Sequence, residues 1–399
     1  MIFNTWEFGA FAVVTYVLYW FVCPPRLRPY LLMAAGLVFY AASIPVYLLL
    51  IIGLASVTYI DGQALLATSP ERKALRRWIL AAGIGASTAV LLFFKYSKLF
   101  ASSFEGVCRG GCVHFLPDII IPLAISFFTF EFVHVLVDVY LGKIRTLALR
   151  DFAVFALFFP TMVAGPIKRY QNFVPQIDVI RRFESLSFAA GTYRIISGLA
   201  KKVVIADSMT PLVAPLLAPA AVYGPLDYWA GVLAYTVKIY FDFSGYSDIA
   251  IGMAQLLGYD ILENFDRPYR APNISQFWRR WHISLSSWIR DYLFIPLGGS
   301  KRPGQTLLNL GIVMAISGLW HGAAWHFVLW GLWHGAGMAI HRVWGAQVVP
   351  RLPFLGRGGV WYTASVATTF TFVALGWVLF ASPTIPTALT VFGNLVGRS

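Results

Sequence analysis

The stretch from Thr306 to Ile340 contains no Asp, Glu, Lys or Arg, and this absence constrains the fold more than any other feature of the chain. One helix of these roughly 35 residues would be about 52 Å long, whereas a membrane crossing needs only ~20 residues. We therefore expect the chain to break or tilt inside the stretch. Gly318, Gly322 and Gly331 are the candidate positions for the break, and His321 lies beside them.

The composition indicates a membrane protein. Hydrophobic residues make up 58% and charged residues 12% of the chain, whereas about a quarter of the residues in soluble domains are charged. The apolar runs are continuous, and only helices satisfy the backbone of such runs in lipid. We expect an all-α integral membrane protein, a polytopic bundle of about 9 to 11 transmembrane or re-entrant helices that forms a single domain over residues 1–399.

The formal net charge of +13 could indicate nucleic-acid binding. However, the basic residues form short clusters between apolar runs, where they favour a cytoplasmic location of those loops. No soluble module is predicted that could present a basic surface to nucleic acid. We therefore expect no nucleic-acid partner, and we interpret the charge as a signal of membrane topology.

The apolar runs predict where the chain crosses the membrane. The segment from Phe152 to Pro166 is too short for a crossing and contains Pro160, so we interpret it as re-entrant. The expected spans lie at about Phe8–Phe21, at Tyr30–Ile60 as a hairpin broken near Pro45, at Trp78–Phe94, Ile119–Tyr140, Leu186–Ile205 and Tyr228–Leu257, within Thr306–Ile340, and at Tyr362–Leu379.

The three cysteines give no clear functional signal. Cys108 and Cys112 fall in a loop that this topology places outside the membrane, where a small disulfide could form. A metal site with the nearby His114 would need further ligands that the sequence does not supply. We assign no function to these cysteines or to Cys23, and we expect no metal site.

The region from Glu263 to Arg302 mixes charged residues with tryptophans, so it cannot be a simple membrane span. After Ser275, a candidate N-cap, apolar residues recur at spacings of three and four, and polar residues gather on the opposite side. The pattern predicts an amphipathic helix with one wet face. The apolar positions are Trp278, Trp281, Leu285, Trp288 and Tyr292, and the polar positions are Arg279, His282, Ser286 and Arg290.

Two interpretations of this amphipathic helix remain open. It could lie in the membrane interface, with tryptophans at the headgroup boundary and arginines against anionic lipid. It could instead fold into the bundle and present Arg279, His282 and Arg290 to a cavity that admits a phosphate-bearing donor from the cytoplasm. Periodicity alone favours the interfacial helix.

His321 also has two interpretations. A histidine between membrane helices can serve packing alone, through hydrogen bonds worth about 0.6 kcal/mol on average. An ionisable residue in the middle of an apolar run is nevertheless a functional candidate by default, and an imidazole with a pKa near ~6.5 can take a proton from a hydroxyl at neutral pH. His334 and His341 share one helix face with small neighbours, which indicates helix packing.

Asp242 and Asp248 place two carboxylates in an otherwise apolar crossing. Such carboxylates usually form ion pairs or line a pathway. Lys238 is four residues before Asp242, so the two could pair on one helix face. This structural ion pair and a role in orienting a catalytic group remain equally open.

Short motifs follow one another through the second half of the chain: Asp242–Asp248, Asn264–Phe265, Pro268–Tyr269, Phe277–Ser284, Arg290–Tyr292, Pro296–Gly299 and Ser317–Gly322. Together with Ile125–Phe130, Asp138–Tyr140 and Ala164–Ile167, this set resembles the membrane-bound O-acyltransferases. Within that family it is most similar to the bacterial alginate O-acetylase group. The resemblance extends from Phe3 and Asn4 to about Phe380.

The resemblance implies acyl transfer from a thioester donor to hydroxyl groups of an extracytoplasmic polysaccharide, in a ring of helices around a central tunnel. It places the catalytic core at about residues 120–345, the catalytic histidine at His321 and a second recurrent histidine at His282. We expect His321 to act as general base, a role worth ~10² to 10⁴ in rate. We expect His282, on the wet face, to position the donor or act as a relay partner.

The resemblance also implies the substrates and partners. We expect acetyl-CoA or a similar acyl thioester as co-substrate, with no bound cofactor. The expected partners are an exported polysaccharide such as alginate, a periplasmic acetyl-handling protein and membrane lipids, and the expected location is the inner membrane, with several crossings. Further residues expected to bind substrate or donor are Arg279, Arg290, Trp320, Asp242 and Asn264.

Three alternatives to acetyl transfer onto an exported polysaccharide remain open. The teichoic acid D-alanyltransferases belong to the same family but usually lack the step seen at Pro296–Gly299, which favours acetyl transfer here. A channel or transporter for a lipid or glycan, with histidines along its path, would need no chemistry, and a structural scaffold would need no histidine at all.

The alginate O-acetylase group usually has further helices after the segment matching Gly376–Phe380, so we expect these C-terminal helices to be absent here.

Overall fold

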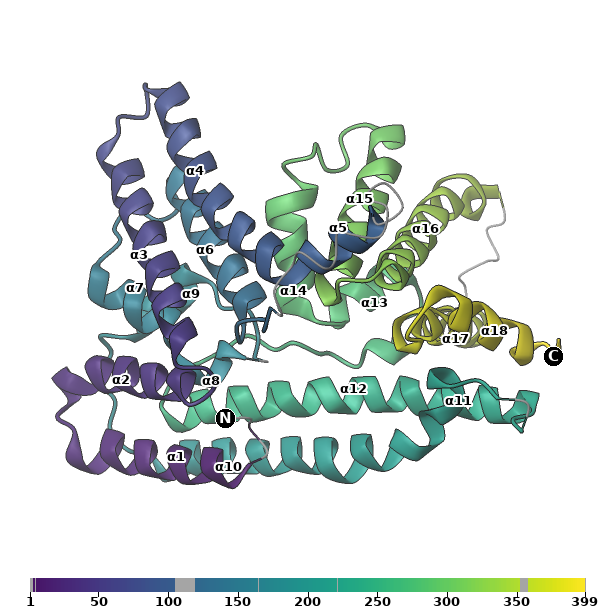
Figure 1. The fold of residues 1–399 in the computed structure, drawn as a ribbon, viewed down its shortest axis with the longest axis horizontal. Helices are drawn as coiled ribbons and strands as arrows, with labels where there is room; N and C mark the ends of the chain where they lie inside the picture. The colour runs from purple at the N-terminus through teal and green to yellow at the C-terminus, as the bar shows by residue number, and fades with distance from the viewer. Residues whose placement is uncertain are drawn as a thin grey trace. The chain divides into compact units, whose positions relative to one another are not determined.

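The computed structural model describes residues 3, 5–104, 119–163, 165–220, 222–351 and 358–398. These residues form helices and connecting segments, and the described part of the chain contains no strand beyond one isolated bridge between Phe265 and Trp281. The described chain divides into two compact units (Figure 1). Unit 1 comprises residues 1–199 and 246–262, and unit 2 comprises residues 200–245 and 263–399.

Unit 1 contains most of the N-terminal helices. Its α-helices are α1 (Trp6–Val17), α2 (Arg28–Ala41), α3 (Val46–Ala67), α4 (Lys73–Leu91), α5 (Ser97–Ser103), α6 (Ile125–Tyr140), α7 (Leu149–Ala156), α8 (Phe159–Met162), α9 (Tyr170–Phe173) and α10 (Ser185–Leu199). It also contains π-helical turns at Leu18–Val22 and Leu92–Tyr96, 3-10 turns at Pro25–Leu27 and Val174–Gln176, and the last residues of α12.

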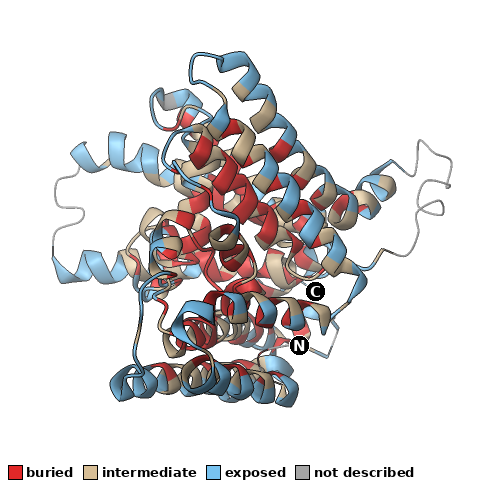
Figure 2. Cartoon of the chain, turned by 90° about the vertical axis from the view of Figure 1, so that its left-hand side faces the viewer, coloured by how far each residue is buried: buried red, intermediate tan, exposed pale blue. Residues whose placement is uncertain are grey.

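The helices α3, α4 and α6 pack side by side in unit 1. The chain ends α2 at Ala41 and begins α3 at Val46, directly after Pro45, so the predicted break in the N-terminal hairpin is confirmed. Figure 2 shows buried positions in red where helices pack together and exposed positions in pale blue on their outward faces. Much of α3 and α4 is exposed, and their exposed side chains are largely apolar, as expected of helices that face lipid.

Buried polar contacts attach an irregular segment of unit 1 to α6. Lys168 donates to Glu131 at 2.7 Å, and both side chains are buried. The backbone N–H of Tyr170 donates to Nε2 of His134 at 3.0 Å, and Gln171 donates to Asp138. The segment predicted to be re-entrant therefore consists of the short helices α7 and α8 followed by irregular backbone that is buried in protein, where such backbone is tolerated.

Unit 2 contains the C-terminal helices. Its α-helices are α11 (Ala214–Leu217), α12 (Pro225–Leu256, which continues into unit 1), α13 (Ile274–Arg280), α14 (Ile283–Ile289), α15 (Pro303–His321), α16 (Trp325–Gln347), α17 (Gly359–Ala381) and α18 (Ile385–Leu395). It also contains π-helical turns at Ala200–Ala206 and Arg290–Phe294 and 3-10 turns at Asp207–Val213, Pro268–Arg270 and Val349–Arg351.

The helices α15 and α16 form a tightly packed hairpin in unit 2 (Figure 1). Any side chain at Gly318 would overlap the carbonyl oxygen of Phe327, and any side chain at Gly331 would overlap that of Met314. Glycines at these two positions therefore allow the backbones to approach, as small residues do between membrane helices. This close approach fixes where the connection between the two helices lies.

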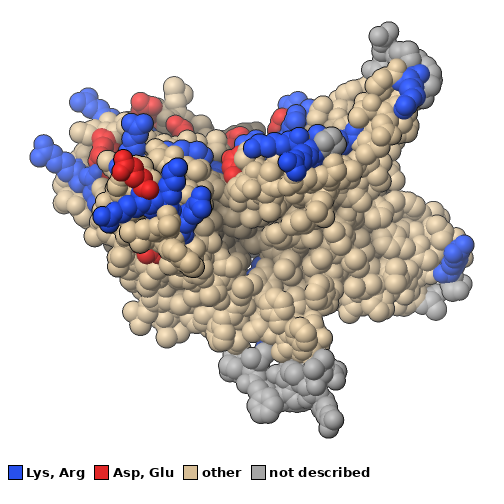
Figure 3. All heavy atoms as spheres, turned by 90° about the horizontal axis from the view of Figure 1, so that it is seen from above, with Lys and Arg blue, Asp and Glu red and all other residues tan. Residues whose placement is uncertain are grey.

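Three described helical stretches are long and apolar enough to cross a membrane: Val46–Ala67, Lys73–Ser103 and Gly359–Ala381. On the face seen in Figure 3, charged side chains gather in clusters and leave broad areas without charge. Both observations agree with the predicted all-α membrane protein. The larger number of spans, the central tunnel and the single domain stay predictions, and Cys108, Cys112 and His114 lie outside the described residues.

Candidate active site

The charge-free stretch breaks directly after His321. Helix α15 ends at this residue, Gly322 has an extended backbone (φ −163°, ψ 150°), and α16 begins at Trp325. The predicted break is therefore confirmed, and it lies at one of the predicted glycines. His321 occupies the last turn of α15, where the carbonyl groups have no helical partners and favour positive charge nearby.

Aromatic rings surround the half-buried imidazole of His321. Its ring centroid lies 4.7 Å from that of Trp320, 5.1 Å from that of Trp330 and 5.1 Å from that of Phe380, each in an edge-on arrangement. Trp330 belongs to α16 and Phe380 to α17, so residues of three helices enclose this imidazole. The rings exclude water from these sides of the imidazole and strengthen electrostatic interactions there.

His326 holds one side of this aromatic enclosure in place. Its Nδ1 lies 3.0 Å from the carbonyl oxygen of Leu379. Because a carbonyl oxygen can only accept, Nδ1 of His326 must donate this hydrogen bond. The bond links the first turn of α16 to the end of α17 and thereby fixes the neighbouring Phe380 against His321.

The second histidine, His282, lies at a break between two seven-residue helices, α13 and α14. Its backbone is left-handed (φ 43°, ψ 57°), a conformation that is uncommon for residues other than glycine. The segment around Phe265 runs beside it: the N–H of Asp266 donates to Arg280, and the N–H of Ile283 donates to Asn264. Strained backbone of this kind persists where the surroundings hold it, and it is frequent at functional sites.

The contacts of Asn264 define the tautomer of His282. The backbone N–H of Ser284 donates to the Asn264 side chain at 3.2 Å, so the atom at that position must be the oxygen Oδ1. The same oxygen lies 3.2 Å from Nδ1 of His282 and accepts from Oγ of Ser284 at 2.8 Å. Since an amide oxygen cannot donate, Nδ1 of His282 carries the proton, and Nε2 of the neutral ring carries a lone pair.

Burial keeps the His282 ring neutral. The residue is only 1% exposed, and it lies outside the membrane-spanning helices, in the connection between α13 and α14. Loss of hydration on burial lowers the pKa of His282 to about 3. Within the described part of the chain, Nε2 of His282 has no hydrogen-bond partner. The site therefore contains a buried, neutral imidazole whose lone pair has no hydrogen-bond partner in the described chain.

Trp320 connects the two histidines. Its ring centroid lies 5.9 Å from that of His282 and 4.7 Å from that of His321. Phe243 of α12 covers another side of His282, at 4.6 Å between ring centroids. The structure thus brings together four of the residues expected from the sequence, namely His321, His282, Trp320 and Asn264.

The predicted amphipathic helix is wrong in three respects. The chain does not form one helix from Ser275: α13 begins after Asn273, whose side chain accepts from the N–H of Gln276, and the helix is interrupted at His282. His282 is buried and not on a wet face. Trp278 and Trp281 pack into the hydrophobic core of unit 2 and Trp288 is buried as well, so the interfacial interpretation is also wrong. Periodicity identified the apolar positions, but it could not show that protein covers them or that Asn264 holds His282 in a left-handed turn.

Three other expected residues are exposed or paired with other side chains. Arg279 and Arg290 are exposed, and Arg290 pairs with Asp291 at 2.8 Å. Asp242 pairs at 2.7 Å with Lys202 and not with Lys238, which donates to Thr210.

The predicted pairing of Lys238 with Asp242 is therefore wrong, because the π-helical segment that follows α10 brings Lys202 to the carboxylate. Asp248 is also paired, with Arg194 at 3.1 Å. Binding of donor or substrate by Arg279, Arg290 or Asp242 stays a prediction.

Sequence reasoning missed the residues that support the histidines. Trp330 and His326 stand in no quoted motif, and only packing brings them to the surroundings of His321. Ser284 and Phe380 end the quoted segments Phe277–Ser284 and Gly376–Phe380, but the sequence did not predict their contacts with Asn264 and His321. His334, in contrast, is fully buried among aromatic rings, as the helix-packing interpretation predicted. Among the described residues, no group of three His, Cys, Asp or Glu side chains could hold a metal ion.

Comparison with known proteins adds independent findings. The model of the membrane-bound O-acyltransferase family matches residues 86–377. The chain is 38% identical over 373 residues to the probable alginate O-acetylase AlgI of Pseudomonas aeruginosa, which covers 92% of this chain and 69% of that protein. It is 33% identical to the peptidoglycan O-acetyltransferase of Helicobacter pylori, over 92% of this chain and 73% of that protein. It is 30% identical to the teichoic acid D-alanyltransferase of Bacillus subtilis, over 65% of this chain and 68% of that protein.

Proposed function

Because the chain belongs to the membrane-bound O-acyltransferase family, we propose that it transfers acetyl groups from a cytoplasmic thioester to hydroxyl groups of an exported polysaccharide. It is a membrane-bound acyltransferase of the group that modifies cell-envelope and exported polymers. The proposal further specifies acetyl-CoA or a similar thioester as the donor, and the inner membrane as the location of the protein. The acceptor is an alginate-like polymer or a periplasmic acetyl-handling partner protein.

The observation that carries this proposal is the pair of imidazoles linked by Trp320. His321 lies at the helix break, where its ring is half-buried, and His282 lies deeper with its tautomer set by Asn264. A transporter path would need polar groups but no defined tautomer. Acyl transfer uses one, because a neutral ring with a fixed lone pair beside the base can orient the reacting groups.

In the proposed reaction, His321 is the general base. Its imidazole takes the proton of the acceptor hydroxyl while the hydroxyl oxygen attacks the carbonyl carbon of the thioester. A C–O bond forms, and the carbonyl electron pair moves onto oxygen. When this tetrahedral intermediate collapses, the C–S bond breaks and the leaving thiolate takes the proton from the His321 imidazolium, which returns the ring to its neutral form.

His282 has a supporting role in this proposal. Its buried ring stays neutral and can accept one hydrogen bond through Nε2, so it suits a polar group of the donor or of the acceptor. A neutral acceptor in a site of low polarity orients its partner without adding charge. We therefore assign His282 to orientation of the reacting groups or to relay of the proton, and we assign Asn264 to holding the His282 ring.

Acetyl transfer is favoured over D-alanyl transfer by two observations. The relatives named as O-acetylases match 92% of this chain, whereas the teichoic acid D-alanyltransferase of Bacillus subtilis matches 65%. The chain also has the Pro296–Gly299 step that D-alanyltransferases usually lack. D-alanyl or other acyl transfer to a cell-envelope polymer remains the second candidate.

The proposal is tested with purified protein, labelled acetyl-CoA and candidate glycans. We expect His321→Ala to lower labelled product by a factor of ~10² to 10⁴, while the variant stays folded and in the membrane. Because His341 is partly exposed at another place in the fold, His341→Ala is the matched control and should keep full activity. Transport of glycan without acetyl product, or full activity in His321→Ala, would reject the proposal in favour of a transporter or a scaffold.

A further inference from the structure

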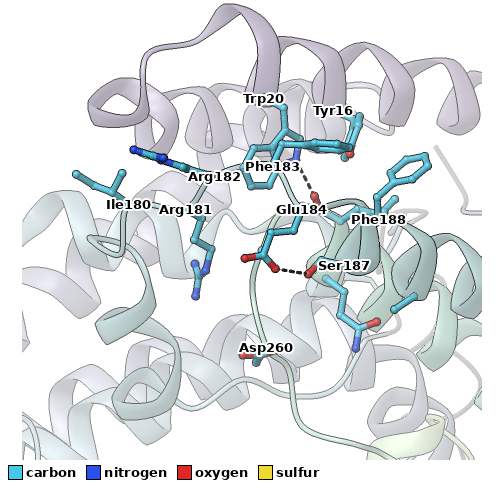
Figure 4. Close-up of a pocket in the computed structure, with 14 residues that line it drawn as sticks. Tyr16, Trp20, Ile180, Arg181, Arg182, Phe183, Glu184, Ser187, Phe188 and Asp260 are labelled. Carbon is cyan, nitrogen blue, oxygen red and sulfur yellow. Dashed lines mark hydrogen bonds between the residues drawn. The ribbon is translucent and has the colours of Figure 1, made fainter.

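Unit 1 contains a cavity of about 570 Å³ that the proposed acyl transfer does not use. Residues of α1 and the turn after it form one side, and α10 with the segment before it forms the other (Figure 4). Volumes between about 300 and 1,000 Å³ are typical of sites for small organic ligands. The residues that line it include Tyr16, Trp20, Arg181, Phe183, Glu184 and Asp260.

One wall of this cavity is a continuous row of aromatic rings. The ring centroids of Tyr16 and Phe188 lie 5.6 Å apart, those of Phe188 and Phe183 lie 6.2 Å apart, and those of Phe183 and Trp20 also lie 6.2 Å apart. Phe183 and Phe188 nevertheless keep 45% and 41% of their surface exposed. Tyr and Trp beside exposed apolar rings are typical of the membrane–water boundary, so this wall suits acyl chains next to a headgroup.

The floor of the cavity carries charges of both signs. In Figure 4, Arg181 and Glu184 extend beneath Trp20 and Phe183 toward Asp260, and Arg182 points outward. Arg181 is held by two hydrogen bonds to Gln176 and by the face of Tyr259, at 5.2 Å from the ring centroid. Its position is therefore fixed before any ligand binds.

The carboxylates at this cavity are not neutralised by the arginines. Within the described chain, neither Glu184 nor Asp260 forms an ion pair, and Glu184 accepts only from Oγ of Ser187 at 3.2 Å. Arg182 also has no ion pair in the described chain, and Arg28 lies behind Trp20 with its guanidinium 4.6 Å from that ring. Separate positive and negative groups at one aromatic-lined cavity fit a ligand that itself carries both charges.

We propose that this cavity binds a glycerophospholipid whose headgroup contains both a phosphate and an ammonium group, as phosphatidylethanolamine does. The phosphate contacts Arg181, the ammonium contacts Glu184 and Asp260, and the acyl chains lie along the aromatic wall. A purely anionic lipid fits less well, because its headgroup would meet two carboxylates without a cation of its own. The proposal does not depend on the acyl-transfer reaction.

Native mass spectrometry of the full-length protein in detergent tests this proposal, with phosphatidylethanolamine and phosphatidylglycerol of identical acyl chains added in turn. We expect phosphatidylethanolamine to be retained more strongly. We expect the double variant Glu184→Gln, Asp260→Asn to bind it about tenfold more weakly and to lose the preference between the two lipids. The variant Arg77→Gln, which changes one exposed arginine of α4 outside the cavity, should bind like the unchanged protein.

A competition measurement and a folding control complete this experiment. Free phosphoethanolamine should not displace the lipid, because the aromatic wall contributes to binding only when acyl chains are present. Thermal unfolding of each variant in the same detergent shows whether it is folded, and the single variant Asp260→Asn, at an exposed position, replaces the double variant if that one unfolds. Equal retention of both lipids, unchanged binding in the folded variants, or displacement of the lipid by acetyl-CoA would overturn the proposal.

Discussion

Two buried histidines of this protein use the same tautomer for different purposes. His134 of unit 1 is fully buried on α6, and its Nε2 accepts from the backbone N–H of Tyr170. His282 of unit 2 is almost as deeply buried, but its Nδ1 donates to Asn264, and its Nε2 has no partner in the described chain. The lone pair of His134 is therefore used by the fold, whereas that of His282 is not used within the described chain.

This difference separates a polar network that the fold closes from one that leaves an acceptor without a partner in the described chain. Around His134, the ion pair of Lys168 with Glu131 and the bond of Gln171 to Asp138 link one segment to one helix. Around His282, the polar groups converge on a single oxygen, Oδ1 of Asn264, and set a ring orientation. Burial alone therefore does not identify a catalytic histidine, and the direction of its hydrogen bonds must be considered as well.

The largest expected difference between the two regions is in activity. His282→Asn keeps a donor near Nδ1 but removes the acceptor at Nε2, so we expect the rate of acetyl transfer to fall by a factor of ~10² to 10⁴. His134→Asn is the matched control, and it should lower the unfolding temperature without changing the rate per folded molecule. Rates measured with labelled acetyl-CoA, normalised to folded protein, test both. A His134 variant with the larger rate loss would reverse the assignment.

The next largest effect is expected in stability. Lys168→Met leaves the carboxylate of Glu131 buried without its cation, and breaking such a buried pair costs about 3 to 5 kcal/mol. We expect a clear fall in the thermal unfolding midpoint in detergent, with an unchanged rate for the molecules that stay folded. Lys168→Met combined with Glu131→Leu should recover part of the lost stability, because no unpaired charge remains. Loss of rate in the folded fraction would show that this network also takes part in the chemistry.

The smallest of the three effects concerns Asn264. Asn264→Leu removes the acceptor that orients His282, so we expect the rate per folded molecule to fall about tenfold, which corresponds to the lost hydrogen bond from His282. The two bonds from Ser284 are lost as well and lower the stability. Asn264→Asp keeps an acceptor for Nδ1 and should retain more activity, with a changed pH dependence because a nearby carboxylate favours the charged imidazole. If both variants lose the same activity and show the same pH profile, Asn264 contacts a substrate and does not act through His282.

The sequence alone determined the class of the protein and its candidate histidines. A charge-free stretch too long for one crossing required a break, and the structure places that break directly after His321. The motifs around His282 and His321 identified the family before any geometry was known. These inferences succeeded because hydrophobic length and local motifs depend on neighbours along the chain.

Only the tertiary structure decided what surrounds each histidine. Periodicity placed His282 on a wet helix face, whereas the fold buries it at a left-handed turn held by Asn264, a residue that approaches from another segment. Helical spacing also suggested that Asp242 pairs with Lys238, whereas in the fold Asp242 forms its ion pair with Lys202. Hydrogen bonds and burial between segments distant in sequence leave no periodic pattern, because each depends on where two separate parts of the chain pack together.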